Sequence, residues 1–283
     1  MGDLEHDTRL SGEAGRYTIT LSGEWRLFGP NGGYMAAVAL RAAGMEAQIR
    51  RPASISCHFI SQPKFEPVEI TVTAHQRGRR AESFHVAMSQ EGRPVLQAIV
   101  RTAIEGEGVE HEVTCMPEAP PPDALKSFLD HWEGPLDDNI TFWQNIDSRI
   151  VYPERINAIN KPWPPNLLEW YRFQPTPTFD DPFVDACRMV ILMDTFTWPA
   201  GANPHRGREE RVIGVNLDVV AWFHRPSNDA AWILCDYESP IARGGLVGGN
   251  GRVWSEDGRL LASGGAQVLC MPDPRPIPPG QTL

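Results

Sequence analysis

Residues 249–268 read GNGRVWSEDGRLLASGGAQV, and residues 83–100, SFHVAMSQEGRPVLQAIV, have the same pattern. In both stretches, alternating apolar segments flank a Gly-containing turn, which predicts an antiparallel hairpin. Aligning Gly92 with Gly258 places Arg101 opposite Gln267, so the two final strands end at equivalent points. This indicates that the chain contains an internal repeat.

Two further strands are predicted before each hairpin from their apolar composition and alternation. They cover residues 55–60 and 68–74 in the first repeat, and 217–223 and 231–237 in the second.

A helical segment is predicted before each set of strands. Residues 31–45 are rich in Ala and Leu and have few charges, which favours burial on most sides. Residues 183–194 follow Asp180-Asp181-Pro182, which has the composition of a helix N-terminal cap with Pro in the first turn. Each repeat is therefore predicted to be a long buried helix followed by four antiparallel strands.

The connection between the repeats is predicted to be a linker, because residues 105–122 are acidic and rich in Pro. The expected organisation is an N-terminal repeat (1–110), a linker (111–135) and a C-terminal repeat (136–283). Before the second helix, only residues 140–151 are assigned as a strand. The Pro-rich tail, residues 272–283, is expected to cover a sheet edge or to fray.

Composition excludes several classes of function. The formal net charge of -10 disfavours nucleic acid as a partner. No secretory h-region and no apolar run of membrane-spanning length occurs, so a cytoplasmic protein without a membrane partner is expected. The five cysteines are widely spaced without a C-x-x-C pair, so they are expected to be reduced and mostly buried, and no metal site is expected.

Several strings resemble those of the acyl-CoA thioesterase II (TesB-like) family. They are Gly32-Gly33-Tyr34, residues 59–63 (FISQP), residues 90–94 (QEGRP), residues 217–226 (LDVVAWFHRP), Glu238-Ser239-Pro240 and residues 257–263 (DGRLLAS). The resemblance implies an α+β double hotdog fold, in which an antiparallel β-sheet wraps a long central helix in each of two tandem repeats. We expect the two sheets to lie back to back within one chain, and we expect further self-association into a homo-oligomer.

The resemblance also implies an activity and a site. The family hydrolyses acyl-CoA with a catalytic Asp, a Thr or Ser, and a Gln, which correspond here to Asp194, Asn216 and Gln267. Asn216 departs from the family pattern, because it has an amide in place of a hydroxyl. No cofactor is implied. No Gly-x-Ser-x-Gly string is present, so we expect Asp194 to activate water directly rather than a serine nucleophile.

Substrate contacts are predicted at two places. Backbone N–H groups of Gly33 and Tyr34, at the start of the first helix, are the expected oxyanion donors. A local group of arginines forms either a solvated hairpin edge or a dock for CoA phosphates, for which Arg79 and Arg80 are the candidates. The group comprises Arg77, Arg79, Arg80, Arg93 and Arg101.

Structural roles compete with these predictions. Asp194 has the position of a helix-terminating residue, and Gln267 and Asn216 have those of ordinary strand residues. Asp218 is interpreted as a structural partner of a backbone amide or an Arg, and His224 as an anchor of the strand exit. Two other functions also remain open at this stage: a non-catalytic acyl-thioester binding protein with a degenerate site, and a hotdog hydratase or dehydratase.

Overall fold

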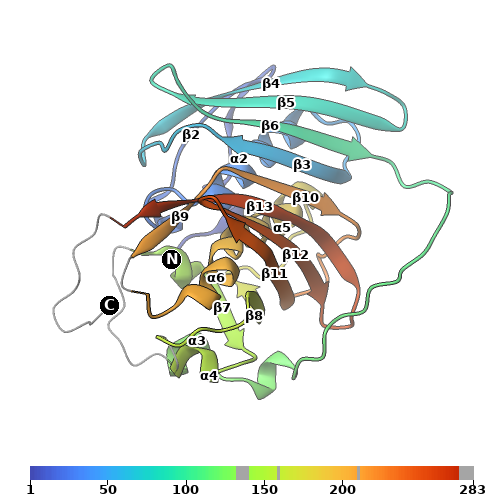
Figure 1. Cartoon of the computed structure of the whole chain (residues 1–283). Helices are drawn as coiled ribbons and strands as arrows, with labels where there is room; N and C mark the ends of the chain where they lie inside the picture. Colours follow the sequence, from blue (N-terminus) through green and yellow to red (C-terminus); the bar gives the residue numbers. More distant parts are fainter. Residues whose placement is uncertain (132–139, 158–159, 209–210, 274–283) are drawn as a thin grey trace.

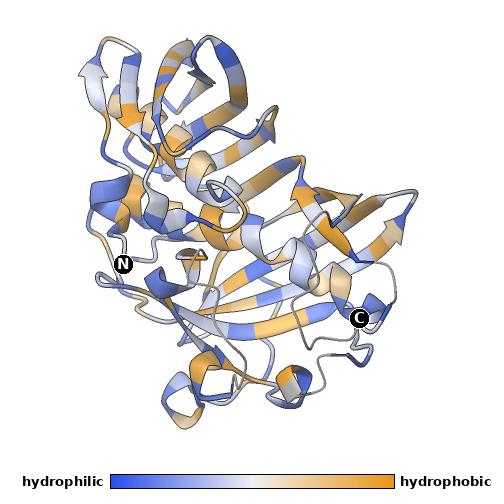
Figure 2. Ribbon diagram, turned by 90° about the vertical axis from the view of Figure 1, so that its left-hand side faces the viewer, coloured by the Kyte–Doolittle hydropathy of each residue, from blue (hydrophilic) through white to orange (hydrophobic). Residues whose placement is uncertain are grey.

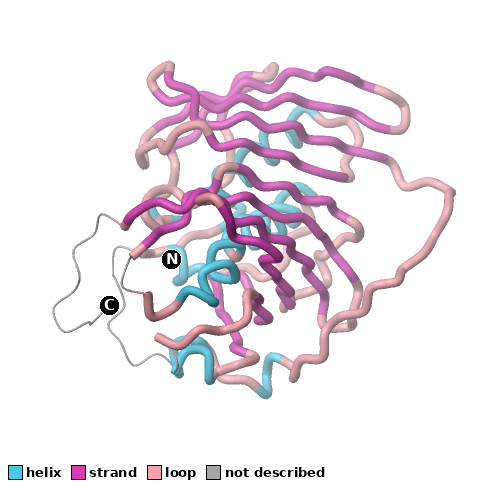
Figure 3. Tube along the Cα trace, viewed as in Figure 1, coloured by secondary structure: helices cyan, strands magenta, loops and turns pink. Residues whose placement is uncertain are grey.

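The computed structural model describes residues 1–131, 140–157, 160–208 and 211–273. Its described strands form one antiparallel sheet that curves around two helices, α2 and α5 (Figure 1). Figure 3 shows these helices together on one side of the strands. The sheet order is β1-β2-β4-β5-β6-β3-β10-β13-β12-β11-β8-β7, and β9 also pairs with β13.

The described strands are β1 (Ser11–Glu13), β2 (Arg16–Thr20), β3 (Pro52–Phe59), β4 (Pro67–Arg77), β5 (Ala81–Gln90), β6 (Arg93–Ala103), β7 (Ile146–Ile150), β8 (Asn166–Phe173), β9 (Val212–Asn216), β10 (Asp218–Phe223), β11 (Ile233–Arg243), β12 (Leu246–Ser255) and β13 (Leu260–Pro272). The α-helices are α1 (Leu4–Asp7), α2 (Gly32–Glu46), α3 (Phe128–His131), α4 (Glu154–Asn157), α5 (Pro182–Thr195) and α6 (Thr197–Ala202). This is the predicted α+β double hotdog architecture.

The two repeats join edge to edge, so the prediction of back-to-back sheets was wrong. Strand β3 pairs with β10 in antiparallel register, with Cys57 opposite Val219 and Ile55 opposite Ala221. These four side chains are buried on the helix side of the sheet, and their neighbours along each strand face outward. The alternation is visible as bands of colour along the strands in Figure 2. Edge-to-edge pairing satisfies the backbone groups of two strands that would otherwise be sheet edges.

Helices α2 and α5 begin as predicted. The Asn31 side chain caps α2 by accepting a hydrogen bond from Tyr34 N, and Asp181 caps α5 by accepting one from Phe183 N. The helices pack closely because α2 has small side chains at the contacts. An added Cβ on Gly33 would lie 2.7 Å from Ile191 Cα in α5. The start of α2 is thereby held against the end of α5.

The segment before α5 contains more structure than predicted. Strand β7 lies inside the predicted range 140–151, but β8 was missed. Residues 167–171 of β8 are buried without interruption, because both faces of this strand are covered. A strand buried on both sides lacks the alternation on which a sequence-based assignment depends.

The linker packs against the protein along part of its length. Met116, Ala119 and Leu125 contact an apolar cluster on the outer face of the second half of the sheet. Trp170 Nε1 in this cluster donates a hydrogen bond to Pro120 O at 2.9 Å. The boundaries set at residues 110 and 136 stay predictions, and residues 132–139 and 274–283, which include most of the C-terminal tail, lie outside the described residues.

The five cysteines are free thiols, and three of them, Cys57, Cys187 and Cys235, are buried as expected. Among the described residues, no helix has both the length and the apolar character needed to cross a membrane.

Candidate active site

Asp194 lies in the last turn of α5, where this helix meets the beginning of α2. Its side chain is 2% exposed. One carboxylate oxygen, Oδ2, accepts a hydrogen bond of 2.6 Å from Gly33 N. The other, Oδ1, accepts one of 2.6 Å from Asn216 Nδ2. Each oxygen therefore has a donor that fixes its direction, and each keeps lone-pair capacity for another partner.

Burial dominates the acid–base properties of Asp194. Removal from water disfavours the charged form and raises the pKa of this carboxyl to about 7. The hydrogen bonds from Asn216 and Gly33 lower the pKa, because they stabilise the carboxylate, and the nearby charge of Asp218 raises it. A carboxylate with a pKa near neutrality has the basicity that suits a general base at physiological pH.

Asn216 reaches Asp194 from the end of β9. Its Nδ2 also donates to the Asp194 backbone oxygen at 2.8 Å, so a single amide holds both the side chain and the end of the helix. Asn216 is opposite Val268 of β13, which is fully buried, so both side chains lie on the helix face of the sheet. The amide thus supplies the donor that a hydroxyl would supply at this position.

Gly32 is half-buried and lies at the edge of the site, next to Asp194. A Cβ on Gly32 would lie 2.9 and 3.0 Å from the two Asp194 carboxylate oxygens and 3.0 Å from the ring of Phe59. The absence of a side chain therefore leaves space directly beside both oxygens. Gly32 was not predicted as a site residue, although the Asn-Gly-Gly start of the helix is a sequence signal that could have identified it.

The predicted oxyanion donors are both engaged within the protein. Gly33 N donates to Asp194, and Tyr34 N donates to Asn31 Oδ1 at 2.8 Å. The Tyr34 ring is fully buried, and its hydroxyl donates to Asp7 O. Tyr34 is therefore a packing residue. In the described part of the chain, the Gly32 N–H has no acceptor, which leaves it as the available donor of this helix N-terminus.

Gln267 is not brought together with the other two predicted residues. Its neighbours on β13, Ala266 and Val268, are buried, whereas Gln267 is exposed. Since side chains alternate along a strand, Gln267 points away from the face that carries Asn216. Its backbone N–H donates to Asp218 Oδ1 at 2.9 Å, which agrees with the interpretation of Asp218 as a structural partner of a backbone amide.

Arg79 and Arg80 lie far from Asp194, and their role as a dock for CoA phosphates stays a prediction. They form the exposed turn between β4 and β5. The adjacent Arg77 contacts Glu46 O at the end of α2, whereas Asp194 contacts Gly33 at its beginning. About 20 Å of helix separates these two points.

Of the arginines in residues 77–101, Arg93 lies at the same end of the strands as Asp194. Its Nε donates to Ser61 Oγ in the segment that follows Phe59.

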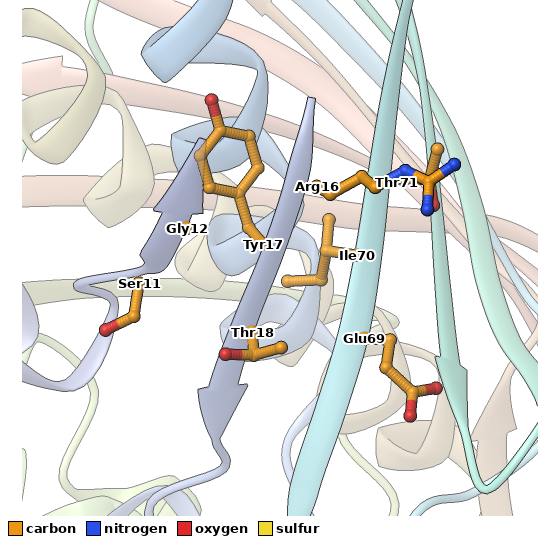
Figure 4. A pocket seen from close by; sticks show the side chains of 8 residues that line it. All are labelled: Ser11, Gly12, Arg16, Tyr17, Thr18, Glu69, Ile70 and Thr71. Atoms are coloured by element: carbon orange, nitrogen blue, oxygen red, sulfur yellow. The ribbon is translucent and has the colours of Figure 1, made fainter. Parts of the chain in front are cut away.

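A surface groove of about 390 Å³ lies elsewhere, between β1, β2 and β4 (Figure 4). Tyr17, which lines it, donates its hydroxyl proton to Glu46 at the far end of α2. The groove therefore contains no residue of the candidate site. Among the described residues, no group of three or more His, Cys, Asp or Glu side chains could hold a metal ion.

His224 and Arg225 lie where β10 ends. His224 Nε2 is 2.8 Å from Ser263 Oγ on β13, and Arg225 pairs with Glu112 of the linker at 2.8 Å. These contacts fit the interpretation of this segment as an anchor of the strand exit.

The continuous sheet around two antiparallel helices, with one buried carboxylate at their junction, defines a double hotdog protein. The solved structures with similar folds agree. A hot dog fold protein of unknown function from Alicyclobacillus acidocaldarius has a TM-score of 0.80 and 22% identity, over 95% of this chain and 98% of its own. The acyl-CoA thioesterase II TesB2 from Mycobacterium marinum has a TM-score of 0.77 and 23% identity, over 96% of this chain and 99% of its own.

Sequence comparison defines the family. Residues 21–103 match the acyl-CoA thioesterase N-terminal domain, and residues 117–271 match the C-terminal domain. The chain belongs to the acyl-CoA thioesterase family, a family of thioester hydrolases. Human acyl-coenzyme A thioesterase 8 is 27% identical over 84% of this chain and 78% of its own length. Acyl-CoA thioesterase 2 from Haemophilus influenzae is 24% identical over 82% and 84%.

Proposed function

We propose that this protein hydrolyses an acyl-CoA to the free acid and CoA, with Asp194 as the general base toward water. The proposal rests on the buried Asp194 carboxylate, which accepts hydrogen bonds from Gly33 N and Asn216 Nδ2. Gly32 lies beside this carboxylate and has no side chain to fill the space next to it. The names of the two curated relatives support acyl-CoA as the substrate class.

The reaction begins when the Asp194 carboxylate accepts a proton from a water molecule beside Gly32. The hydroxyl oxygen attacks the thioester carbonyl carbon, and the carbonyl oxygen becomes negatively charged. The Gly32 N–H at the start of α2 is the donor for this charge, since the first-turn N–H groups and the helix dipole favour an anion. When the C–S bond breaks, the proton held by Asp194 passes to the departing thiolate. Free acid and CoA thiol are the products.

Asn216 positions the base. Its amide fixes Oδ1 of Asp194 and lowers the pKa of the carboxyl, so that a useful fraction is ionised near neutral pH. This is how an amide replaces the family's hydroxyl without loss of the donor. Gln267 has no role in this mechanism, because its side chain lies on the other face of the sheet.

We further propose that Arg93, rather than Arg79 or Arg80, contacts a CoA phosphate. Arg93 is exposed and lies beside the segment that continues from Phe59, at the Gly32 side of the site. Arg93→Gln should raise KM for acyl-CoA and leave kcat unchanged, as expected for a contact made equally in the ground and transition states. Arg79→Gln is the matched control and should change neither value.

The test of the function is release of free thiol from a panel of short, medium, long and aromatic acyl-CoAs. Asp194→Asn should reduce the rate by about 10²–10⁴. Asp236→Asn is a matched control, because burial also raises the pKa of Asp236, which lies on β11 away from the site. If the wild-type protein releases no thiol from any substrate, the proposal is wrong. Bound but uncleaved acyl-CoA would then favour a binding protein, and water addition to an enoyl-CoA a hydratase.

A further inference from the structure

A second cavity of about 340 Å³ lies at the opposite end of the helix pair from Asp194. Its walls come from the segment after α2, the beginning of α5 and the segment after β10. Ala186 and Met189 of α5 and Phe223 of β10 form apolar parts of the lining. Ala186 is eight residues before Asp194, which corresponds to about 12 Å along the helix. The cavity is therefore separate from the candidate active site.

When the two repeats are compared, the cavity and the candidate active site lie at corresponding positions, each at the start of one repeat's helix. In the active site, the start of α2 meets the end of α5, next to Phe59 at the end of β3. At the cavity, the start of α5 meets the end of α2, next to Phe223 at the end of β10.

The catalytic carboxylate has no equivalent at this second position. Gly33 contacts Asp194 at the first junction, whereas Gly44 contacts the ring of Phe183 at the second. The chain has thus kept the concavity of a second site without its base, so we assign no reaction to it.

A buried ion pair fixes the walls of the cavity. Asp185 pairs with Arg188, which is fully buried, and also accepts hydrogen bonds from Ser227 N and Oγ. The Arg188 guanidinium donates in addition to Pro177 O and Ala230 O. These bonds tie the segments before α5 and after β10 to the helix. Both Asp185 oxygens and both terminal nitrogens of Arg188 have partners in this network, and Arg188 Nε is the buried atom of the pair that has none among the described residues. Since most of the cost of burying the charges is thereby offset, the network makes the cavity a preformed feature.

The mouth of the cavity offers one cation without a carboxylate partner. Arg50 pairs with Asp181, and Arg225 pairs with Glu112. Arg51 donates to Ile104 O, but among the described residues it forms no ion pair. Asp180 also lines the cavity and limits how many negative charges it can accept. An apolar interior with one available guanidinium at its mouth suits a ligand with an apolar tail and a single anionic group.

We propose that this cavity is a non-catalytic binding site for an acyl chain with an anionic head group, which Arg51 pairs with at the mouth. The chemistry fits two sources: a free fatty acid, which would pair with Arg51 through its carboxylate, and an acyl-CoA, which would pair through a phosphate because its thioester is uncharged. The proposal depends on the lining of the cavity and not on the hydrolysis at Asp194.

The test is calorimetric titration of the full-length protein with decanoate at pH 8, where Asp194 is ionised and repels a carboxylate. Arg51→Gln should weaken decanoate binding about tenfold, because a charge-assisted hydrogen bond is lost. Ala186→Leu should abolish the binding by filling the cavity. Arg79→Gln, an exposed arginine on a remote turn, is the matched control and should bind as the wild type does. If Ala186→Leu fails to fold, the comparison of Arg51→Gln with Arg79→Gln decides.

A second titration identifies the source of the acyl chain. Decanoyl-CoA is added to Asp194→Asn protein, with and without Arg51→Gln. An effect of Arg51→Gln on decanoate supports the free acid as ligand, and an effect on decanoyl-CoA alone supports the acyl thioester. If Arg51→Gln changes the affinity for neither decanoate nor decanoyl-CoA, the proposal is wrong. The outcome is independent of the thiol-release assay, because decanoate binding requires no turnover.

Discussion

The pH dependence of hydrolysis tests the role assigned to Asp194. Burial raises the pKa of this carboxyl to about 7, and only the ionised form can accept a proton from water. The rate constant kcat/KM should therefore increase tenfold per pH unit below pH 7 and level off above it. At pH 6 the expected value is about one tenth of the plateau.

Replacing Asn216 should move this profile in a calculable direction. The Asn216 amide donates to Asp194 Oδ1 at 2.6 Å and lowers the pKa of the carboxyl. A hydrogen bond to a charged group contributes about 1.5–3 kcal/mol, which corresponds to about one to two pKa units. In Asn216→Ala the acid limb should thus move up to between about pH 8 and 9. Activity at pH 7 should fall about fivefold to fiftyfold and recover as the pH rises.

The assay is thiol release from one acyl-CoA between pH 5 and 9.5, corrected for the uncatalysed hydrolysis of the thioester. Asn216→Thr restores a side-chain donor, so its acid limb should lie between those of the wild type and Asn216→Ala. An acid limb that stays near pH 7 in Asn216→Ala would refute the coupling of this amide to the base. A flat wild-type profile over the whole range would refute Asp194 as the base.

Three substitutions test the geometry of the site. Gly32→Ala places a Cβ 2.9 and 3.0 Å from the carboxylate oxygens of Asp194, so thiol release should fall at least about tenfold with an unchanged urea midpoint. Gly33→Ala places one 2.7 Å from Ile191 Cα, so urea unfolding should show a loss of about 1–3 kcal/mol. Gln267→Ala should retain wild-type thiol release, because this side chain is exposed on the outer face; a hundredfold loss would return Gln267 to the catalytic set.

The location of Asp194 at the end of a helix was predictable, whereas its environment was not. A capped apolar helix that ends at Asp194 could be identified from the sequence, because the Asp-Pro cap and the apolar composition are local signals. Gly33 and Tyr34 were predicted as substrate contacts from the helix N-terminus, but the approach of this helix start to Asp194 was not predicted. It depends on the contact between Gly33 and Ile191, which are far apart in the sequence.

Gln267, Arg79 and Arg80 do not lie beside Asp194, and the reasons are geometric. Side chains alternate between the two faces of a strand, so the face on which Gln267 lies depends on the register of β13, which the resemblance to the family did not define. The distance from the arginine turn to Asp194 is set by the length of α2, which separates the two ends of the helix pair. Neither quantity is encoded in the local composition.

The sequence by itself determined the repeat, the two helices and the cap of the second one, most of the hairpin strands and the position of one acidic residue at a helix end. These features follow from local propensity and from periodic burial, which can be recognised within a short stretch of sequence. The tertiary structure decided the edge-to-edge pairing of β3 with β10, the carboxylate held by Gly33 and Asn216, and the second cavity. Each of these joins segments from different repeats, and such contacts depend on packing across the whole sheet rather than on neighbouring residues.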